Sequence, residues 1–287
     1  MSATQSQNPS MNGKRVLVTG PTSGIGKEIA AQLAGLGAEL VLACRDVERG
    51  KSAAAEIERR TGSKHCAVMT VDTSSAKSIR GFAVLFRQKY PRLDVLVNDA
   101  GVYLNRKQTG EDGIELTFAT NVLGYFLLTQ ELLDLLRSSA PARIVNVAST
   151  FAGELDLGDL QFERRRYDGQ KAYKQSKACD RLLTWAFARR LEGSGVTANA
   201  MAPGLVQTGL YRHMLPVPRL ALRVAGLFFG RSAAQGADTA VWLASSPEVK
   251  GVTGKFFELR QEAACRFRNT EDEEKLWKIC EELTRSA

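Results

Sequence analysis

The chain has 287 residues, of which 44% are hydrophobic and 24% charged, a composition typical of a globular protein with a large core. The net charge is +8, but Lys and Arg are mixed with Asp and Glu along most of the sequence, which argues against a nucleic-acid-binding stripe. Five scattered cysteines and only two histidines exclude a disulfide framework and a histidine-rich metal site, so we expect no metal and a reducing, cytoplasmic location.

The amino-terminal residues 1–13 are polar and lack an apolar signal core, and no stretch of the chain is long enough to span a membrane. We therefore expect a flexible leader over residues 1–13 and no transmembrane segment. No internal repeat, low-complexity tract or linker interrupts the remainder. Residues 14–287 are accordingly predicted to form a single domain.

Short apolar runs alternate with segments of helical periodicity from residue 14 onward. Strands are predicted at residues 15–19, 39–44, 66–71, 95–98, 143–148, 196–201 and 255–259. Helices are predicted at residues 25–36, 47–60, 75–90, 113–138, 170–191 and 233–245, with a further amphipathic helix in a tail over 262–287. Most strands are unbroken runs of Val, Leu, Ile and Ala, as in parallel sheets covered on both faces. The pattern predicts an α/β fold, a single-domain Rossmann-type doubly wound parallel sheet of about seven strands with helices on both faces.

One segment, residues 210–231, interrupts this alternation. It is rich in Leu, Val and Phe and contains four arginines but no acidic residue. Ligands of doubly wound sheets bind beyond the carboxyl ends of the strands, and the segment follows the strand at 196–201, so we expect a substrate lid. Its composition favours a lipophilic substrate or a peripheral contact with a membrane surface. An apolar lid packed on the domain explains the composition equally well.

A glycine-rich run, Thr19-Gly20-Pro21-Thr22-Ser23-Gly24-Ile25-Gly26, lies between the first strand and the first helix. Glycines permit a tight turn and a close approach of the backbone to a pyrophosphate, while the start of the helix adds N–H groups and a positive dipole. A purely structural turn is the alternative. The position directly after the first strand favours a dinucleotide site.

The end of the second strand predicts which dinucleotide binds. An acidic residue there accepts a hydrogen bond from the ribose 2′-hydroxyl of NAD, whereas a nearby arginine suits the 2′-phosphate of NADP. The strand ends at Cys44 and is followed by Arg45 and then Asp46. Because a guanidinium binds phosphate in a bidentate fork, this order favours NADP(H) over NAD(H). A surface pair between Arg45 and Asp46 is the alternative.

Tyr173 and Lys177 are four residues apart on a predicted helix, so they lie one turn apart on the same face. A neighbouring ammonium favours the phenolate and makes a tyrosine a usable proton donor and acceptor near neutral pH. The spacing alone is common, and a surface tyrosine above a surface lysine is the ordinary alternative. The other motifs of the chain favour the catalytic interpretation.

These motifs together resemble those of the short-chain dehydrogenase/reductase family. The residues around Arg45 and the tail that bears Trp277 are most similar to the retinol dehydrogenase-like branch of that family. The matching residues occur in the family's order and cover nearly the whole chain: Thr19–Gly26, Asp72, Asn98-Asp99-Ala100-Gly101, Asn121, Ser149, Tyr173, Lys177 and Pro203-Gly204.

The resemblance implies a catalytic set of Asn121, Ser149, Tyr173 and Lys177. In this set, Tyr173 exchanges the proton and Lys177 assists it and holds the nicotinamide ribose. Ser149 hydrogen-bonds the substrate oxygen, and Asn121 holds a water of the proton relay. The cofactor contacts implied by the resemblance are Gly20, Thr22, Ser23, Gly24, Ile25, Gly26, Arg45, Asp72, Thr73, Asn98, Ala100, Gly101, Tyr173, Lys177, Pro203, Gly204, Val206 and Thr208.

Some residues depart from the family's pattern. Asp99 stands where a second asparagine is usual, and Ala148 stands where the branch often has serine. Thr150 follows Ser149 and is a weaker rival for its role. Pro21 stiffens the glycine-rich turn. The membrane anchor usual in the branch is not found, which weakens the expectation of a membrane retinoid as the native substrate.

The sequence thus predicts an NADP(H)-dependent oxidoreductase that interconverts carbonyl and alcohol groups on a small lipophilic, apolar or aromatic molecule by hydride transfer, with a Ser-Tyr-Lys-Asn proton relay. The alternatives are a non-catalytic NADP(H)-binding regulator or scaffold, and a reductase of carbon–carbon double bonds on the same fold. We expect no nucleic-acid partner. The resemblance further implies a homodimer paired through the long helices at 113–138 and 170–191.

Overall fold

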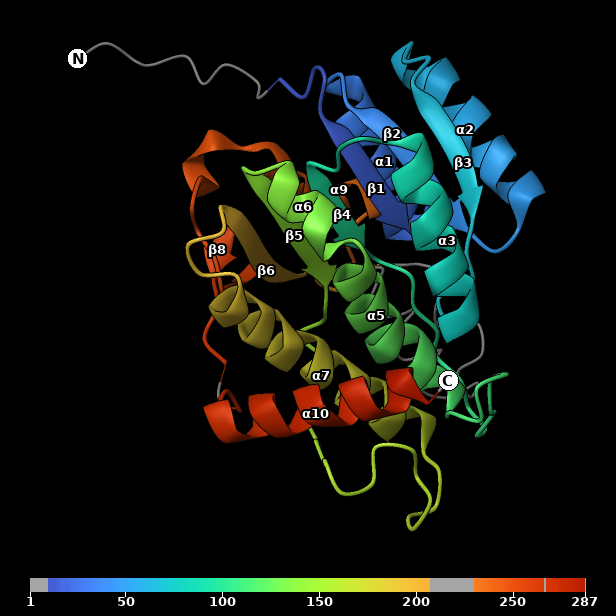
Figure 1. The fold of residues 1–287 in the computed structure, drawn as a ribbon, viewed down its shortest axis with the longest axis vertical. Coiled ribbons are helices and arrows are strands. Elements are labelled where there is room, and N and C mark those ends of the chain that lie inside the picture. Colours follow the sequence, from blue (N-terminus) through green and yellow to red (C-terminus); the bar gives the residue numbers. More distant parts are fainter. Residues whose placement is uncertain (1–9, 207–229, 266, 287) are drawn as a thin grey trace.

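The structure is a computed structural model, and it describes residues 10–206, 230–265 and 267–286. Within these residues, eight strands form one sheet in the order β3-β2-β1-β4-β5-β6-β7-β8 (Figure 1). Neighbouring strands are parallel except for β7 and β8. The order reverses between β1 and β4, which is the switch point at which doubly wound sheets bind ligands. The strands are β1 Arg15–Thr19, β2 Glu39–Cys44, β3 Cys66–Thr70, β4 Val95–Asn98, β5 Ala142–Val147, β6 Val196–Ala202, β7 Phe256–Glu258 and β8 Gln261–Glu262.

This architecture confirms the predicted single-domain, doubly wound sheet. The bounds of the predicted strands differ from the observed ones by at most one residue at either end. The additional strand is β8, which consists of two exposed residues and pairs antiparallel with β7. Two polar residues carry no hydrophobic periodicity, so a sequence pattern does not predict such a strand.

Helices cover both faces of the sheet (Figure 1). On one face, α1, α2 and α9 bury apolar side chains such as Ile29 and Leu243 against the strands. On the other face, α3, α5 and α7 bury Phe86, Phe126 and Phe187. The helices are α1 Gly24–Gly35, α2 Val47–Thr61, α3 Ala76–Lys89, α4 Leu116–Phe118, η1 Ala119–Leu123, α5 Gly124–Glu131, α6 Leu133–Ser138, α7 Gly169–Arg190, α9 Ala233–Ser245, η3 Pro247–Val249 and α10 Thr270–Arg285.

The long helix predicted at 113–138 is divided in the structure, and in this respect the prediction was wrong. It begins only at Leu116, because the carboxylate of Glu115 accepts hydrogen bonds from the N–H groups of Thr117 and Phe118 and caps the helix there. A π-helical turn, η1, follows, and Leu132 separates α5 from α6. Apolar spacing continues through these irregularities, so hydrophobic periodicity does not reveal them. Inserted π-helical turns are often found at functional sites.

The carboxyl-terminal helix α10 lies across α7 and α5 (Figure 1). Its Trp277 packs edge-on against Phe126 of α5 and Phe187 of α7, with ring centroids 4.9 and 4.8 Å apart. The guanidinium of Arg190 lies 3.9 Å from the centroid of the Trp277 ring. The homodimer expected through the long helices stays a prediction. It would have to form on a face that the chain itself covers in part with α10.

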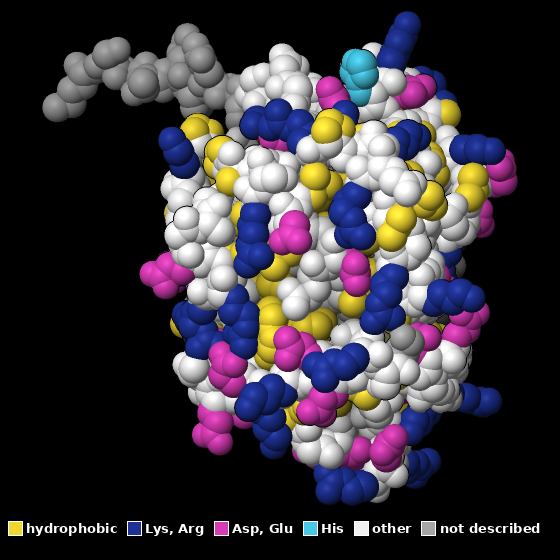
Figure 2. Space-filling view, in the orientation of Figure 1, with side chains coloured by type: hydrophobic (Ala, Val, Ile, Leu, Met, Phe, Trp, Pro, Cys, Tyr) yellow, Lys and Arg dark blue, Asp and Glu magenta, His cyan; other side chains and the backbone are white. Residues whose placement is uncertain are grey.

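The ends and the surface of the domain complete the fold. Met11 is buried, and its N–H donates to the carbonyl of Leu36, so the chain is packed on the domain within the expected leader. Residues 1–9 and most of the expected lid at 210–231 lie outside the described residues. Among the described helices, none combines the length and apolar character needed to cross a membrane. On the face drawn in Figure 2, basic and acidic side chains are interspersed.

Candidate active site

The predicted site residues come from different parts of the chain and meet at one edge of the sheet. The glycine-rich turn follows β1, Asn98–Gly101 follow β4, Ser149 follows β5, and Pro203-Gly204 follow β6. Because these strands are parallel, their carboxyl ends face the same way. The site therefore lies beside the switch point of the sheet, where a dinucleotide binds in folds of this class.

The glycine-rich turn has the geometry that a cofactor cradle needs. Gly20 and Gly24 adopt φ angles of +68° and +59°, which side chains disfavour. A Cβ atom on Gly26 would lie 2.4 Å from Oδ2 of Asp99 and 2.5 Å from the carbonyl oxygen of Gly20. Ser23 precedes α1 without a capping hydrogen bond from its side chain. The turn thus leaves the start of α1 open to an anionic group such as a pyrophosphate.

Asp99, the residue that departs from the family's pattern, lies directly beneath this turn. Its backbone N–H and that of Ala100 both donate to Oγ1 of Thr19, which ties the end of β4 to the end of β1. Burial raises the pKa of the Asp99 carboxyl to about 7, although the charge of Lys177 and the N–H of Gly26 oppose the shift. A carboxyl group that titrates near neutral pH therefore forms part of the floor of the cradle.

At the far end of the cradle, Arg45 follows β2 and its side chain is 65% exposed. The carboxylate of Asp46 accepts a hydrogen bond from the N–H of Arg49 and caps α2. The guanidinium of Arg45 lies 4.0 Å from a carboxylate oxygen of Asp72, which follows β3. Asp72 also accepts hydrogen bonds from the N–H and hydroxyl of Ser74. Asp46 is thus engaged in the helix cap, while Arg45 extends over the carboxyl ends of β2 and β3.

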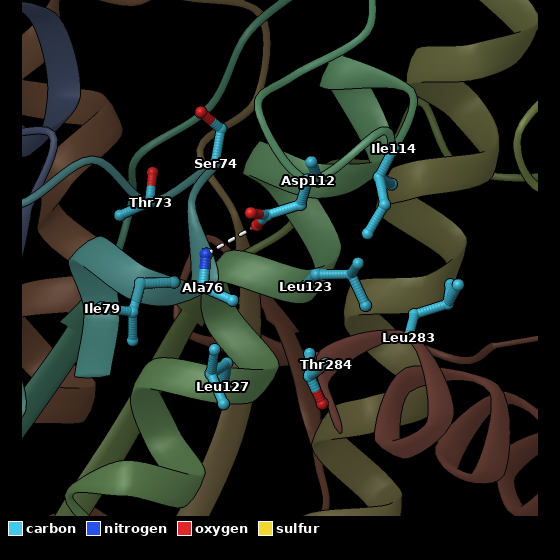
Figure 3. A pocket seen from close by; sticks show the side chains of 11 residues that line it. Thr73, Ser74, Ala76, Ile79, Asp112, Ile114, Leu123, Leu127, Leu283 and Thr284 are labelled. Carbon is cyan, nitrogen blue, oxygen red and sulfur yellow. Dashed lines mark hydrogen bonds between the residues drawn. The ribbon is translucent and has the colours of Figure 1, made fainter. Parts of the chain in front are cut away.

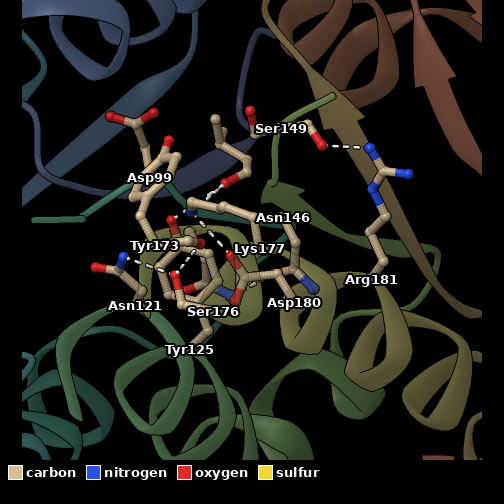
Figure 4. A network of polar contacts seen from close by, with 12 residues as sticks. Asp99, Asn121, Tyr125, Asn146, Ser149, Tyr173, Ser176, Lys177, Asp180 and Arg181 are labelled. Carbon is tan, nitrogen blue, oxygen red and sulfur yellow. Dashed lines mark hydrogen bonds and ion pairs between the residues drawn. The ribbon is translucent and has the colours of Figure 1, made fainter. Parts of the chain in front are cut away.

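Tyr173 and Lys177 lie together in the interior on α7, which begins after Asp168 caps it. Each of the two is only 4% exposed, so the pair is not a surface feature. The ammonium of Lys177 lies 5.9 Å from the ring centroid of Tyr173 and 5.2 Å from that of Tyr125. It donates to the carbonyl of Val147, at 2.9 Å (Figure 4). The alternative of an exposed tyrosine above an exposed lysine is therefore excluded.

Asn121 lies within the π-helical turn and is fully buried. Its amide oxygen accepts from the N–H of Val102, and its amide nitrogen donates to the carbonyl of Val102 and to the hydroxyl of Ser176. Ser176 in turn donates to the carbonyl of Tyr173. Asn121 therefore fastens the segment after β4 to the helix that carries Tyr173. The expected role of Asn121 in holding a relay water stays a prediction.

Ser149 is 9% exposed at the end of β5, whereas its rival Thr150 is exposed. The hydroxyl oxygen of Ser149 accepts from the N–H of Phe151, which leaves the hydroxyl proton available to a substrate oxygen. The carbonyl of Ser149 accepts from the guanidinium of Arg181, a buried residue on α7 (Figure 4). The geometry therefore favours Ser149 over Thr150 as the donor.

The other expected cofactor contacts are divided. The side chain of Asn98 points into the core, where it donates to Thr129 and to Asn146, so it does not face the cradle. Val206 is buried at the end of the described segment, and Thr208 lies outside the described residues. The remaining expected contacts lie along the carboxyl edge of the sheet and the turns that follow it: Thr22, Ile25, Thr73, Gly101, Pro203 and Gly204.

An apolar pocket lies away from the Tyr173–Lys177 pair, between α3, η1 and the end of α10 (Figure 3). Its wall includes Thr73, Leu127 and Leu283. The carboxylate of Asp112 accepts a hydrogen bond from the N–H of Ala76 at its rim. The pocket includes none of the four expected catalytic residues, and of the expected cofactor contacts only Thr73 lines it. We therefore do not assign the reaction to this pocket.

The sequence interpretation missed two charged residues near the site, Asp180 and Arg181. Both are buried on α7, one turn beyond Lys177, with exposures of 1% and 5%. A signal for Asp180 was present in the sequence, because residues three apart on a helix face the same way. The predicted periodicity of the helix gave no reason to expect that this face is buried. Within the described residues, no cluster of three or more His, Cys, Asp or Glu side chains is placed to hold a metal ion.

The chain is similar to known proteins over most of its length. The pattern of the short chain dehydrogenase family matches residues 14–216. The chain belongs to this family. As a short-chain dehydrogenase it is an oxidoreductase of alcohol and carbonyl groups, on a fold that binds a nicotinamide dinucleotide.

Relatives and solved structures agree with this membership. Human retinol dehydrogenase 14 is 42% identical over 265 residues, which cover 86% of this chain and 78% of the relative. Human retinol dehydrogenase 12 is 40% identical over 282 residues, which cover 96% and 88%. The crystal structure of an uncharacterised protein from Mycobacterium paratuberculosis is 31% identical with a TM-score of 0.77, covering 96% and 95%. The Pseudomonas aeruginosa RhlG/NADP active-site complex is 28% identical with a TM-score of 0.71, covering 88% and 98%.

Proposed function

We propose that this short-chain dehydrogenase uses NADP(H) to interconvert an alcohol and a carbonyl on a small apolar or aromatic molecule. The observation that carries the proposal is the buried Tyr173–Lys177 pair beside Ser149, at the edge of the sheet that also carries the glycine-rich cradle. The dinucleotide, when bound, supplies or accepts the hydride. The side chains of the protein handle the proton and the charge on the substrate oxygen.

In the direction of reduction, Tyr173 donates a proton to the carbonyl oxygen of the substrate. In oxidation, its phenolate takes the proton of the alcohol. The ammonium of Lys177 favours the phenolate, because it lies close to the ring in an interior where charges interact strongly. The hydroxyl of Ser149 donates to the substrate oxygen and stabilises the charge that develops on it. Asn121 holds these elements in register through Val102 and Ser176.

The proposed preference for NADP(H) rests on the residues after β2. Arg45 is exposed, with its guanidinium over the carboxyl ends of β2 and β3 and 4.0 Å from Asp72, while Asp46 is engaged in capping α2. The RhlG complex, which resembles this chain, contains NADP. We expect Arg45→Ala to weaken NADPH binding by about 1.5–3 kcal/mol, the range of a hydrogen bond to a charged group. Calorimetric titration of NADPH and NADH with this variant measures the difference.

NADH binding should change little in Arg45→Ala. The matched control is Arg59→Ala, which removes an exposed arginine near the other end of α2 and should leave both affinities unaltered. Equal losses for NADPH and NADH in Arg45→Ala would contradict a role in phosphate recognition.

The surroundings of Tyr173 support the proposed substrate class. The ring of Tyr103 lies 5.7 Å from that of Tyr173, so an aromatic surface adjoins the reacting hydroxyl. The relatives named retinol dehydrogenases suggest an apolar alcohol or aldehyde for this chain as well. We propose a cytoplasmic protein with a small lipophilic substrate and, through residues 210–231, a peripheral membrane contact. A turnover screen of apolar alcohols, aldehydes and ketones with NADP(H) tests the substrate class.

Replacement of Tyr173 by Phe tests the mechanism. The variant should lose turnover by at least about a thousandfold, because the general acid and its hydrogen bond are both removed. Its affinity for NADPH, measured by calorimetric titration, should stay within about twofold of the unmodified protein. Tyr90→Phe is the control, since Tyr90 lies at the end of α3, beside Arg15 at the opposite edge of the sheet.

The same assays separate the alternatives. Tight NADPH binding without turnover over a broad panel of ketones, aldehydes and quinones would favour a non-catalytic regulator. Product analysis by mass spectrometry and NMR distinguishes reduction of a carbonyl from reduction of a carbon–carbon double bond. Full turnover in Tyr173→Phe would overturn the assignment of the proton donor.

A further inference from the structure

A second buried carboxyl group lies directly behind the lysine of the active site. Oδ2 of Asp180 is 2.8 Å from the ammonium of Lys177, and the two side chains are 0% and 5% exposed (Figure 4). The residues are three apart on α7, so the helix itself fixes their contact. The ammonium is thus held from two sides, by Asp180 and by the carbonyl of Val147.

The hydrogen bonding of Asp180 is incomplete. Its other oxygen, Oδ1, is buried and accepts no hydrogen bond from the described residues. A buried carboxylate with one unpaired oxygen lowers the stability of the fold, although its charge compensates the buried ammonium of Lys177. The buried charge of Lys177 offers a reason for an acid at this position.

The groups around Asp180 come from several elements. From α7 itself, the positive charges of Lys177 and Arg181 favour the ionised form of Asp180, and Cys179 adjoins it. Tyr125 of α5 and Cys280 of α10 face Asp180, and the carboxylate raises the pKa of both groups in addition to the larger effect of burial.

On the other side of Lys177 lies Asp99. Burial raises the pKa of its carboxyl, and the charge of Lys177 opposes that shift. One ammonium therefore lies between two carboxyl groups. Burial also raises the pKa of Asp180, to about 6, against the opposing charge and hydrogen bond of Lys177. The ion pair with Lys177 favours the charged form of Asp180, while burial opposes it.

We propose that Asp180 is a positioning residue for the Tyr173–Lys177 pair: it fixes the ammonium of Lys177 and, when ionised, offsets part of the effect of that ammonium on the phenol. The inference rests on the proposed function. Its consequence is that the balance between phenol and phenolate at Tyr173 depends on the charge at Asp180, one helical turn further into the core.

Replacing Asp180 by Asn tests this dependence. Asparagine keeps the shape and an acceptor for Lys177 but removes the charge. The ammonium is then uncompensated and favours the phenolate of Tyr173. A unit charge at this depth, with an effective dielectric constant of about 20, shifts a nearby ionisation by about one pH unit. The basic limb of the pH profile of kcat for carbonyl reduction should therefore move to lower pH by about one unit.

In alcohol oxidation the acidic limb should move to lower pH by the same amount, because the phenolate is then the required form. Asp159→Asn is the matched control. It removes a buried carboxylate paired with Arg165 outside the site, and it should lower stability without moving either limb. Asp180→Glu retains the charge and should restore both limbs toward their original positions.

A second measurement does not depend on turnover. Ultraviolet difference titration of tyrosinate absorbance, with Tyr173→Phe as the blank, reports the ionisation of Tyr173 directly. The same downward shift is expected in Asp180→Asn, with Asp180→Ser as a second neutral variant should the first not fold. Unmoved limbs and an unmoved tyrosinate titration in the folded neutral variants would overturn the proposal. A shifted titration in a protein that turns over no substrate would uphold the inference on Asp180 and reject the proposed function.

Discussion

Replacing Asp99 by Asn should change how cofactor binding depends on pH. The carboxyl of Asp99 lies against Gly26 in the floor of the cradle, and burial raises its pKa to about 7. A dinucleotide brings a negatively charged pyrophosphate to the same turn, which favours the neutral carboxyl. Binding should therefore take up a proton when the pH is above about 7. Asparagine at position 99 removes that linkage.

The size of the effect follows from the pKa. If the bound state holds Asp99 neutral, the apparent Kd scales as one plus ten to the power of the pH minus 7, which gives at most about 50-fold weaker binding at pH 9 than at pH 7. Calorimetric titration of NADPH across this range measures it. At pH 8, in buffers of different ionisation enthalpy, the original protein should take up about one proton for each cofactor bound, and Asp99→Asn close to none.

Stability gives an independent check on Asp99. A carboxyl whose pKa is raised on folding disfavours the folded state increasingly as the pH rises from about 4 through about 7, and the full cost is present above pH 7. Asp99 keeps some exposure to solvent, so we expect Asp99→Asn to stabilise the fold by about 1–2 kcal/mol at pH 8 and hardly at all at pH 4. Identical pH dependence of NADPH affinity in the two proteins would refute the proposed linkage.

Two further predictions concern packing. Trp277→Ala should destabilise the protein by about 3–5 kcal/mol, because it empties the contact between α10, α5 and α7. Thermal unfolding measures this loss. The control Trp242→Ala, on α9, should have a smaller effect because that ring is partly exposed. Gly26→Ala should weaken NADPH binding at least about tenfold, since its Cβ would meet Asp99 and Gly20 at about 2.5 Å. The control Gly81→Ala, on α3, should leave the affinity unchanged because a Cβ has open space there. Equal affinities in the two variants would show that the turn does not shape the cradle.

The fold could be predicted from the sequence because its signals are local and repeated. Buried parallel strands such as β1 and β2 carry continuous apolar runs, and the amphipathic helices between the strands repeat the same unit. The exposed pair of residues in β8 carries no such signal. The division of the helix predicted at 113–138 was also hidden, because it depends on the cap by Glu115 and on the tertiary contacts of Asn121 rather than on periodicity.

The site could be predicted in outline because its residues follow strands, and parallel strands deliver their ends to one edge. The direction in which each side chain points could not be predicted. Asn98 and Ser149 each lie at or just beyond the end of a strand, yet Asn98 faces the core and bonds to Asn146, while Ser149 stays at the edge. The sequence shows that residues 99 and 180 are acidic. It does not show that their pKa values are raised, because that shift depends on burial by elements far away in the chain.

Helix α10 has a consequence for how the protein can be handled and altered. It packs on α5 and α7 through Trp277, and its Cys280 is buried facing Asp180. The helix therefore shields the carboxyl of Asp180 from water. Shortening the chain before residue 270, or a tag that loosens this helix, would admit water to that carboxyl and restore its ordinary acidity. A change made at the carboxyl-terminal helix would then alter the pH dependence of the ionisation of Tyr173.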